Sequence, residues 1–368
     1  MKKYLLLIIA AGLTLNAADA ETKWLKVGED KNLKVYGLPW FAENDGLFYR
    51  LPVREQENIT KTAWWMSKCP SGARVRFKTD STSLKLKINH GMEESSRIAM
   101  WHMGAAAVSG IDLYLGPPQD NLFWMTTRPK DGSNEYEHTY FTSKSRQMRE
   151  FTLYLPVYAE LASLKVGVDS DAAVEGPTEY QIQKPIVVYG TSITQGACAS
   201  RGSNSFAAIV GRRLNADIVN LGFSGSGCGE EIMARLIAEI DASVYIVDSV
   251  ANMNAEFMEQ RYEKFVTILR QTRPEIPVIL MTKIRYAGEF EPKRKAVYDQ
   301  QHKPLFETYE KFVKQGDKKV YLFDAGEIIK PGGDHPTVDG THMTDTGFHI
   351  IADELTPFVA SIISDKDK

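Results

Sequence analysis

The stretch VVYGTSITQG, from Val187 to Gly196, places a short polar turn directly after a run of β-branched and aromatic residues. The apolar run is typical of a strand that is buried in a parallel sheet. Thr191 and Ser192 then stand where a helix would begin. A serine at this point either caps the helix or acts as a nucleophile at the carboxyl end of the strand.

The remainder of the chain after this turn alternates between strand and helix patterns. Four more short apolar runs are predicted strands: DIVNLG (217–222), VYIVD (244–248), PVILMT (277–282) and VYLFD (320–324). The segments between them carry apolar residues at helical spacing, and a last helix is predicted around Pro357, which would kink it. This alternation predicts a three-layer, flavodoxin-like, doubly wound parallel sheet over residues 182–368.

The preceding residues follow a different period, with apolar and polar residues alternating. In SLKLKIN (83–89), the leucines and the isoleucine face one way and the two lysines the other. Similar runs recur from about Leu33 to Asp169, separated by Gly, Pro, Asp and Ser. We therefore predict an all-β sandwich domain over residues 21–175, with the boundary in AVEGPTEYQIQKP (173–185).

The first twenty residues have the pattern of a cleavable signal peptide. Two lysines precede an apolar run, and the small residues of Ala18-Asp19-Ala20 predict cleavage after Ala20. The mature protein is then expected to be periplasmic or secreted. No second apolar run is long enough to predict membrane insertion, and a formal net charge of −3 gives no reason to expect nucleic acid as a partner.

The cysteines and histidines argue against a disulfide scaffold and against a metal site. An odd count of three cysteines leaves at least one thiol free. A bridge between Cys198 and Cys228 is one possibility in an oxidising compartment, and two free thiols are the alternative, whereas Cys69 is expected to stay free. The histidines show no H-x-x-x-H or H-x-H spacing, so we predict no metal and no cofactor.

Polar residues gather where the predicted strands end, which is where open α/β sheets bind their ligands. A long loop after the last strand contains Asp339 and His342, three residues apart, so that the carboxylate can orient the imidazole. Ser192 would then be a nucleophile that His342 activates. Each residue alone has an ordinary explanation, as a helix cap or a solvated loop pair, but their joint placement at one sheet edge favours a catalytic triad.

The same edge offers hydrogen-bond donors for an oxyanion. The predicted donors are the backbone N–H groups of Ser192 and Gly225 and the side-chain amide of Asn252. The Gly-rich segment around Gly225 lacks the lysine of a P-loop, and Asn252 has an alternative role as a helix cap.

These motifs resemble those of the SGNH (GDSL-type) hydrolase superfamily. The four blocks of the superfamily correspond to GTSITQG (190–196), NLGFSGSG (220–227), VDSVAN (247–252) and DGTH (339–342). The resemblance implies the roles already given to Ser192, Gly225, Asn252 and His342, with Asp339 as the partner of His342. The sequence departs from the usual pattern at two positions, where Thr191 replaces an aspartate and Ala251 a glycine.

The segment GIDLYLG, from Gly110 to Gly116, resembles the G-x-D-L-Y signature of a β-sandwich that precedes some bacterial SGNH enzymes. Enzymes of this arrangement are similar to carbohydrate esterases, which implies an acylated carbohydrate substrate. The alternatives are a thioesterase or lysophospholipase that uses the same triad, and a glycan-binding protein without activity.

Overall fold

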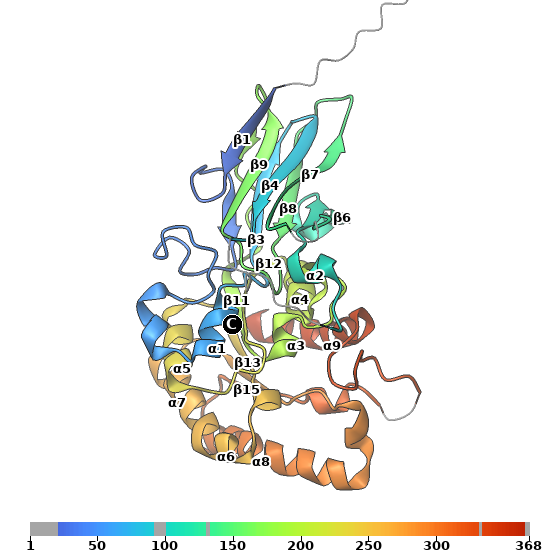
Figure 1. Cartoon of the computed structure of the whole chain (residues 1–368). Helices are drawn as coiled ribbons and strands as arrows, with labels where there is room; N and C mark the ends of the chain where they lie inside the picture. Colours follow the sequence, from blue (N-terminus) through green and yellow to red (C-terminus); the bar gives the residue numbers. More distant parts are fainter. Residues whose placement is uncertain (1–20, 92–100, 130–132, 331–332, 365–368) are drawn as a thin grey trace, which may run out of the picture.

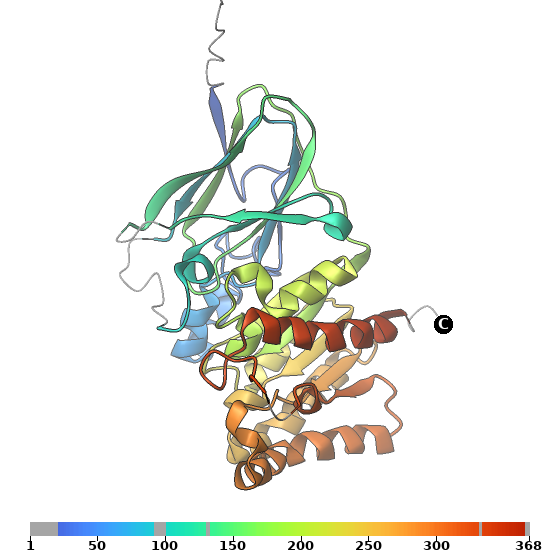
Figure 2. The same cartoon turned by 90° about the vertical axis from the view of Figure 1, so that its right-hand side faces the viewer.

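The computed structural model describes residues 21–91, 101–129, 133–330 and 333–364, which form a β-sandwich lying against an α/β unit (Figures 1 and 2). The predicted signal peptide lies outside these residues. Within the described ranges, no helix is both long and apolar enough to cross a membrane.

The β-sandwich consists of two antiparallel sheets. One has the strand order β1-β9-β4-β7, and its strands are β1 (Thr22–Lys26), β9 (Ser163–Asp169), β4 (Ser83–Asn89) and β7 (Glu135–Thr142). The other has the order β10-β3-β8-β5-β6, and β2 also pairs with β3; its strands are β10 (Val174–Glu175), β3 (Arg74–Thr79), β8 (Arg149–Tyr154), β5 (Asp112–Leu115), β6 (Leu122–Thr126) and β2 (Lys34–Tyr36). The predicted all-β fold of this half is confirmed.

The alternation in β4 has the predicted outcome. Leu84, Leu86 and Ile88 are buried between the sheets, and Lys85 and Lys87 are only partly buried. β1 and β10 lie outside the range from Leu33 to Asp169 over which strands are predicted. Two short helices in this half, α1 (Lys61–Ser67) and α2 (Ala105–Ser109), were not predicted.

The α/β unit contains one parallel sheet with the strand order β12-β11-β13-β14-β15. Its strands are β12 (Ala216–Gly222), β11 (Ile182–Gly190), β13 (Val244–Asp248), β14 (Val278–Met281) and β15 (Val320–Phe323). This order is the flavodoxin-like one, so the predicted fold class is confirmed.

Helices cover both faces of this sheet (Figure 2). The bounds of the helices are α3 (Ser192–Gln195), α4 (Phe206–Leu214), α5 (Glu231–Glu239), α6 (Ala255–Phe257), α7 (Glu263–Thr272), α8 (Pro292–Lys314) and α9 (Asp345–Ser364). In β11, Ile186 and Val188 belong to the core shared with α4 and α9, and Val187 and Tyr189 to the core shared with α5 and α7. Residues next to one another in a strand point to opposite faces, so a continuous apolar strand supports both layers. Pro357 lies inside α9.

The two halves share buried contacts. Arg50, from the β-sandwich half, is completely buried and donates hydrogen bonds to the carbonyl oxygens of Asn220 and Gly222 at 3.1 and 2.5 Å. Trp64 of α1 packs in the same hydrophobic cluster as Met233 of α5. These contacts attach the β-sandwich to the strand that carries part of the candidate site.

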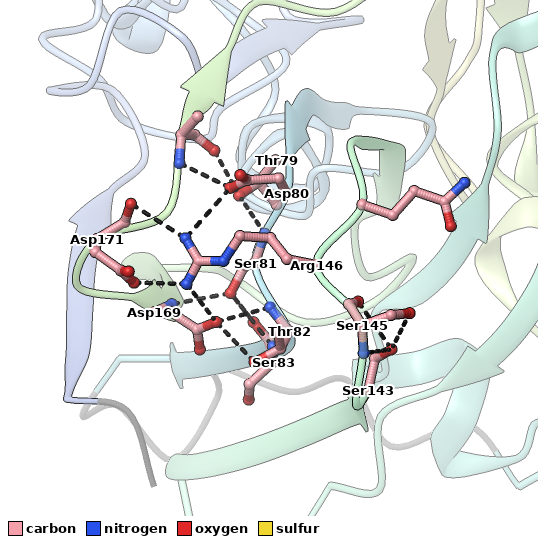
Figure 3. A network of polar contacts seen from close by, with 12 residues as sticks. Thr79, Asp80, Ser81, Thr82, Ser83, Ser143, Ser145, Arg146, Asp169 and Asp171 are labelled. Atoms are coloured by element: carbon pink, nitrogen blue, oxygen red, sulfur yellow. Dashed lines mark hydrogen bonds and ion pairs between the residues drawn. The ribbon is translucent and has the colours of Figure 1, made fainter. Parts of the chain in front are cut away.

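A polar network closes the end of the β-sandwich that lies away from the α/β unit (Figure 3). The guanidinium of Arg146 is 2.6 Å from a carboxylate oxygen of Asp171 and 3.6 Å from one of Asp169. Asp169 also accepts hydrogen bonds from the backbone N–H and the hydroxyl of Thr82, both at 2.7 Å. The network therefore joins the β3–β4 turn to the end of β9.

Candidate active site

The nucleophile turn lies between β11 and α3. Gly190 ends the strand, and a β-carbon built at this glycine would lie 2.0 Å from the Thr194 hydroxyl oxygen, so no larger residue fits. The Thr194 hydroxyl accepts a hydrogen bond from the Thr191 N–H at 3.2 Å and donates one to Asp248 at 2.6 Å. This tight turn presents Ser192, whose hydroxyl oxygen lies 3.0 Å from Nε2 of His342.

His342 and Asp339 come from the loop between β15 and α9. Nδ1 of His342 lies 2.8 Å from Oδ2 of Asp339. The other carboxylate oxygen of Asp339 accepts hydrogen bonds from the backbone N–H groups of Thr341 and His342, at 2.9 and 2.8 Å. Partial burial acts to raise the pKa of Asp339, but these hydrogen bonds outweigh it and lower the pKa to about 2. The carboxylate therefore stays charged and holds the imidazole with Nε2 toward the serine.

Backbone contacts keep this loop in place. Thr337 and Met343 form an isolated antiparallel bridge, and the Val338 N–H donates to the carbonyl of His342 at 2.8 Å. Gly340 has a φ of +87°, in the left-handed region that glycine adopts without strain. The bridge and the turn together bring Asp339 and His342 to the same side, which their spacing of three residues alone does not ensure.

The predicted oxyanion donors lie at neighbouring strand ends. Gly225 follows β12 in a turn with a φ of +66°, and a β-carbon there would meet no atom within 4 Å, so its backbone borders open space. Asn252 follows β13 and donates a side-chain hydrogen bond to the Phe223 carbonyl at 3.2 Å. One N–H of this amide thus supports the turn that contains Gly225. Among the described residues, the amide donates no second hydrogen bond.

The β-sandwich half contributes two residues that the sequence analysis did not identify. Nε2 of His102 lies 3.7 Å from Oδ2 of Asp339, and its ring meets the His342 ring edge-on with centroids 5.1 Å apart. Trp101 stacks on His102 at 4.7 Å and is 85% exposed. No motif marks these residues, because their proximity to the loop depends on how the two halves pack.

The cysteines are free thiols, so the possible bridge between Cys198 and Cys228 is not formed. The sulfur of Cys228 approaches the carbonyl oxygens of Gly225 and Asn252, at 4.0 and 3.5 Å. Cys198 instead lies beside the two histidines described above. Burial, with a smaller contribution from the charge of Asp339, raises the pKa of Cys198 to about 12, so this thiol is protonated at neutral pH.

Among the residues that the structure describes, His102, Cys198 and His342 form a group that could hold a metal ion. Each offers one ligand atom, and the three atoms lie within 4.8 Å of one another. An ion bound there would occupy the imidazole that faces Ser192 and would block it. The prediction of no metal considered only spacing in the sequence, and this group comes from three distant segments.

Two family models match the chain in succession. Residues 183–360 match the GDSL-like lipase/acylhydrolase family, and residues 22–174 match the GxDLY domain, described as the N-terminus of SGNH-hydrolase-type esterases. Among curated proteins, none matches this chain.

Solved structures share the whole two-part architecture. A GDSL-like lipase from Bacteroides ovatus is 28% identical, with a TM-score of 0.82 over 94% of this chain and 98% of that one. The salicylyl-acyltransferase SsfX3 of a tetracycline biosynthetic pathway is 18% identical, with a TM-score of 0.75 over 93% and 97%. The acetyl xylan esterase Est2A from Butyrivibrio proteoclasticus is 13% identical, with a TM-score of 0.59 over 93% and 99%. At these identities, the last two show a common fold.

Proposed function

Because this chain belongs to the GDSL-like lipase/acylhydrolase family over residues 183–360 and carries the N-terminal domain of SGNH-type esterases, we propose that it is a serine carbohydrate esterase. The observation that carries the proposal is the continuous contact from Ser192 through His342 to Asp339, at 3.0 and 2.8 Å. This is the arrangement that activates a serine hydroxyl for acyl transfer.

The reaction proceeds through an acyl-enzyme. Oγ of Ser192 attacks the ester carbonyl while Nε2 of His342 takes its proton, and Asp339 stabilises the imidazolium that forms. The N–H groups of Ser192, Gly225 and Asn252 donate to the oxyanion. The tetrahedral intermediate then expels the alcohol, which receives the proton from His342. A water molecule, activated by the same imidazole, attacks the acyl group and releases the acid and the free serine.

Trp101 supports a carbohydrate as the alcohol part of the ester. One face of its indole lies on His102, whose ring in turn contacts the His342 imidazole, and Trp101 is 85% exposed. A flat, exposed aromatic ring provides an apolar surface for a sugar ring. The tryptophans considered from the sequence fit this role less well, since Trp40 and Trp64 are buried and Trp65 is 37% exposed. The 13%-identical Est2A, an acetyl xylan esterase, has the same fold.

The test compares acyl groups and alcohols separately. We expect the mature protein to cleave 4-nitrophenyl acetate much faster than the octanoate and to release acetate from acetylated polysaccharides. Strong preference for octanoate would instead support a lysophospholipase or thioesterase. Absence of hydrolysis on every ester would support a glycan-binding protein.

Variants of two tryptophans test the carbohydrate directly. Trp101→Ala is expected to raise KM for an acetylated polysaccharide while leaving KM for 4-nitrophenyl acetate unchanged. Trp124→Ala is the matched control, because Trp124 is a half-exposed tryptophan on β6 of the β-sandwich. An equal effect of both variants on the polysaccharide would contradict the role of Trp101.

We also propose that residues 1–20 are removed during export. The support is the charged start, the apolar run and the small residues at Ala18 and Ala20. Mass spectrometry of the protein recovered outside the cytoplasm should give a chain that begins at Glu21. A chain that keeps Met1 would contradict export by cleavage.

A further inference from the structure

We propose that His102, which the β-sandwich half supplies, is a positioning residue of the catalytic site that holds Asp339 and His342 in line with Ser192. The inference rests on the proposed hydrolase function and adds a fourth polar side chain to its triad. It also means that the β-sandwich half contributes a side chain that positions the triad.

Two contacts place His102 against the catalytic pair. Its Nε2 approaches the oxygen of Asp339 that binds His342, at 3.7 Å, and its ring packs edge-on against the His342 ring, with an interplanar angle of 89°. The His102 side chain is only 5% exposed, and Trp101 covers one of its faces. A rigid ring in this place prevents the His342 imidazole from rotating away from Asp339.

The surroundings of the two ring nitrogens of His102 fit a neutral ring with its proton on Nε2. Nε2 faces the Asp339 carboxylate, so an N–H there is favoured by the negative charge. Nδ1 is buried and has no hydrogen-bond partner within the described part of the chain. A ring nitrogen without a proton tolerates the lack of a partner better than an N–H does. Burial lowers the pKa of His102, the nearby His342 lowers it further, and Asp339 opposes both.

Among the described residues, three titratable side chains lie beside His102: Asp339, His342 and the thiol of Cys198. An N–H on Nε2 of His102 faces the carboxylate of Asp339 and favours its position against the His342 ring. Removing His102 is therefore expected to loosen the Asp339–His342 pair and to slow the activation of Ser192.

The experiment compares three variants of the full-length mature protein. His102→Phe keeps a ring but removes the N–H, and His102→Gln restores an N–H donor. His138→Phe is the control, because His138 is a partly buried histidine of β7 in the same half. Hydrolysis of 4-nitrophenyl acetate gives kcat and KM, and labelling by a fluorophosphonate probe reports the reactivity of Ser192 without any assumption about the natural substrate.

We expect His102→Phe to lower kcat and the labelling rate between about tenfold and a hundredfold, with KM nearly unchanged. His102→Gln should recover much of the rate, and His138→Phe should behave like the wild type. Thermal unfolding of each variant checks that it is folded.

Two results would overturn the inference. One is a folded His102→Phe protein with the wild-type kcat and labelling rate. The other is a loss of rate that His102→Gln does not repair, since a packing role alone would give that pattern. Labelling of Ser192 without hydrolysis of any ester would refute the hydrolase function alone. Failure of the wild type to be labelled would refute both.

Discussion

The hydroxyl of Ser192 serves reactivity, whereas the fold of the turn depends on the backbone of Ser192. Its hydroxyl contacts His342, whereas its backbone carbonyl accepts the hydrogen bonds that close the turn at Gly196 and Ala197. We expect Ser192→Ala to lower kcat by about a thousandfold or more, with unchanged stability. A variant that keeps a tenth of the wild-type kcat would contradict the assignment of the nucleophile.

Asp339 and His342 should differ in the size of their effect on kcat. In Asp339→Asn the amide cannot accept the Nδ1 proton in the same way, but the base and the oxyanion donors remain. We expect kcat of Asp339→Asn to be about 10- to 100-fold higher than kcat of His342→Ala. Steady-state kinetics on one nitrophenyl ester decides the order, and the reverse order would contradict the roles given to the two residues.

Asp248, beneath the nucleophile turn, should make stability depend on pH. Burial raises its pKa to about 7, although the Thr194 hydroxyl opposes the shift. A folded-state pKa above the unfolded one means that the carboxyl stabilises the fold at low pH, and that this contribution is lost as the pH rises to about 7. Asp248→Asn keeps an acceptor for Thr194 and does not ionise.

The free energy of unfolding of Asp248→Asn, relative to the wild type, should therefore grow by a few kcal/mol between pH 4 and pH 7, since one pKa unit corresponds to about 1.4 kcal/mol. Urea unfolding at pH 4, 5.5 and 8 measures it. Asp241→Asn is the control, because Asp241 is an exposed carboxylate that pairs with Lys184. A difference that does not change with pH would contradict the buried, raised-pKa carboxyl.

At the scale of elements, the turn after β12 contains two glycines with different constraints. A β-carbon at Gly227 would lie 1.9 Å from the carbonyl oxygen of Gly190, at the end of the nucleophile strand. A β-carbon at Gly225 would meet nothing, and only its φ of +66° opposes a side chain.

We expect Gly227→Ala to separate the two turns and to abolish activity. Gly225→Ala should cost only about 1–2 kcal/mol and should keep much of the activity, because its N–H remains in place. Unfolding curves and kcat of the two variants are the measurement. Equal losses of stability and kcat in both variants would contradict the view that the close approach of Gly227 to the Gly190 carbonyl makes Gly227 the more sensitive position.

Across the whole molecule, Arg50 is the clearest link between the halves. It donates to the carbonyls of Met66 and Cys69 within its own half, in addition to Asn220 and Gly222 in the other. Burial lowers its pKa to about 10, so the guanidinium remains charged at neutral pH. Lysine, with its compact ammonium, cannot reproduce a planar set of four bonds.

We expect Arg50→Lys to lower the free energy of unfolding by about 3 kcal/mol or more, because buried carbonyls lose their donors. Arg54→Lys is the control: Arg54 is exposed, pairs with Glu43 and Glu239, and should cost less than about 1 kcal/mol. Urea unfolding measures both. Similar small losses would mean that the interface does not depend on Arg50.

Local patterns in the sequence were sufficient to predict both fold classes. The alternation in β4 indicates a strand buried on one side, and the uninterrupted apolar run in β11 indicates a strand buried on both sides. The sequence therefore distinguishes the antiparallel sheets of the sandwich from the parallel sheet. The proximity of the predicted triad residues could also be predicted from the sequence, because parallel strands end at a common edge and bring Ser192 to the loop of Asp339 and His342. Their catalytic roles stay a prediction that the variants above address.

Other features were decided by the tertiary structure alone. His102 and Trp101 reach the triad loop because two halves with separate periodicities pack on each other, and no spacing within either half encodes that contact. The burial of Arg50, the free thiol of Cys198 beside His342, and the pKa of Asp248 likewise depend on atoms from distant segments. Periodicity is a property of neighbours along the chain, whereas burial and charge at a site arise from neighbours in space, and only the packed molecule determines these.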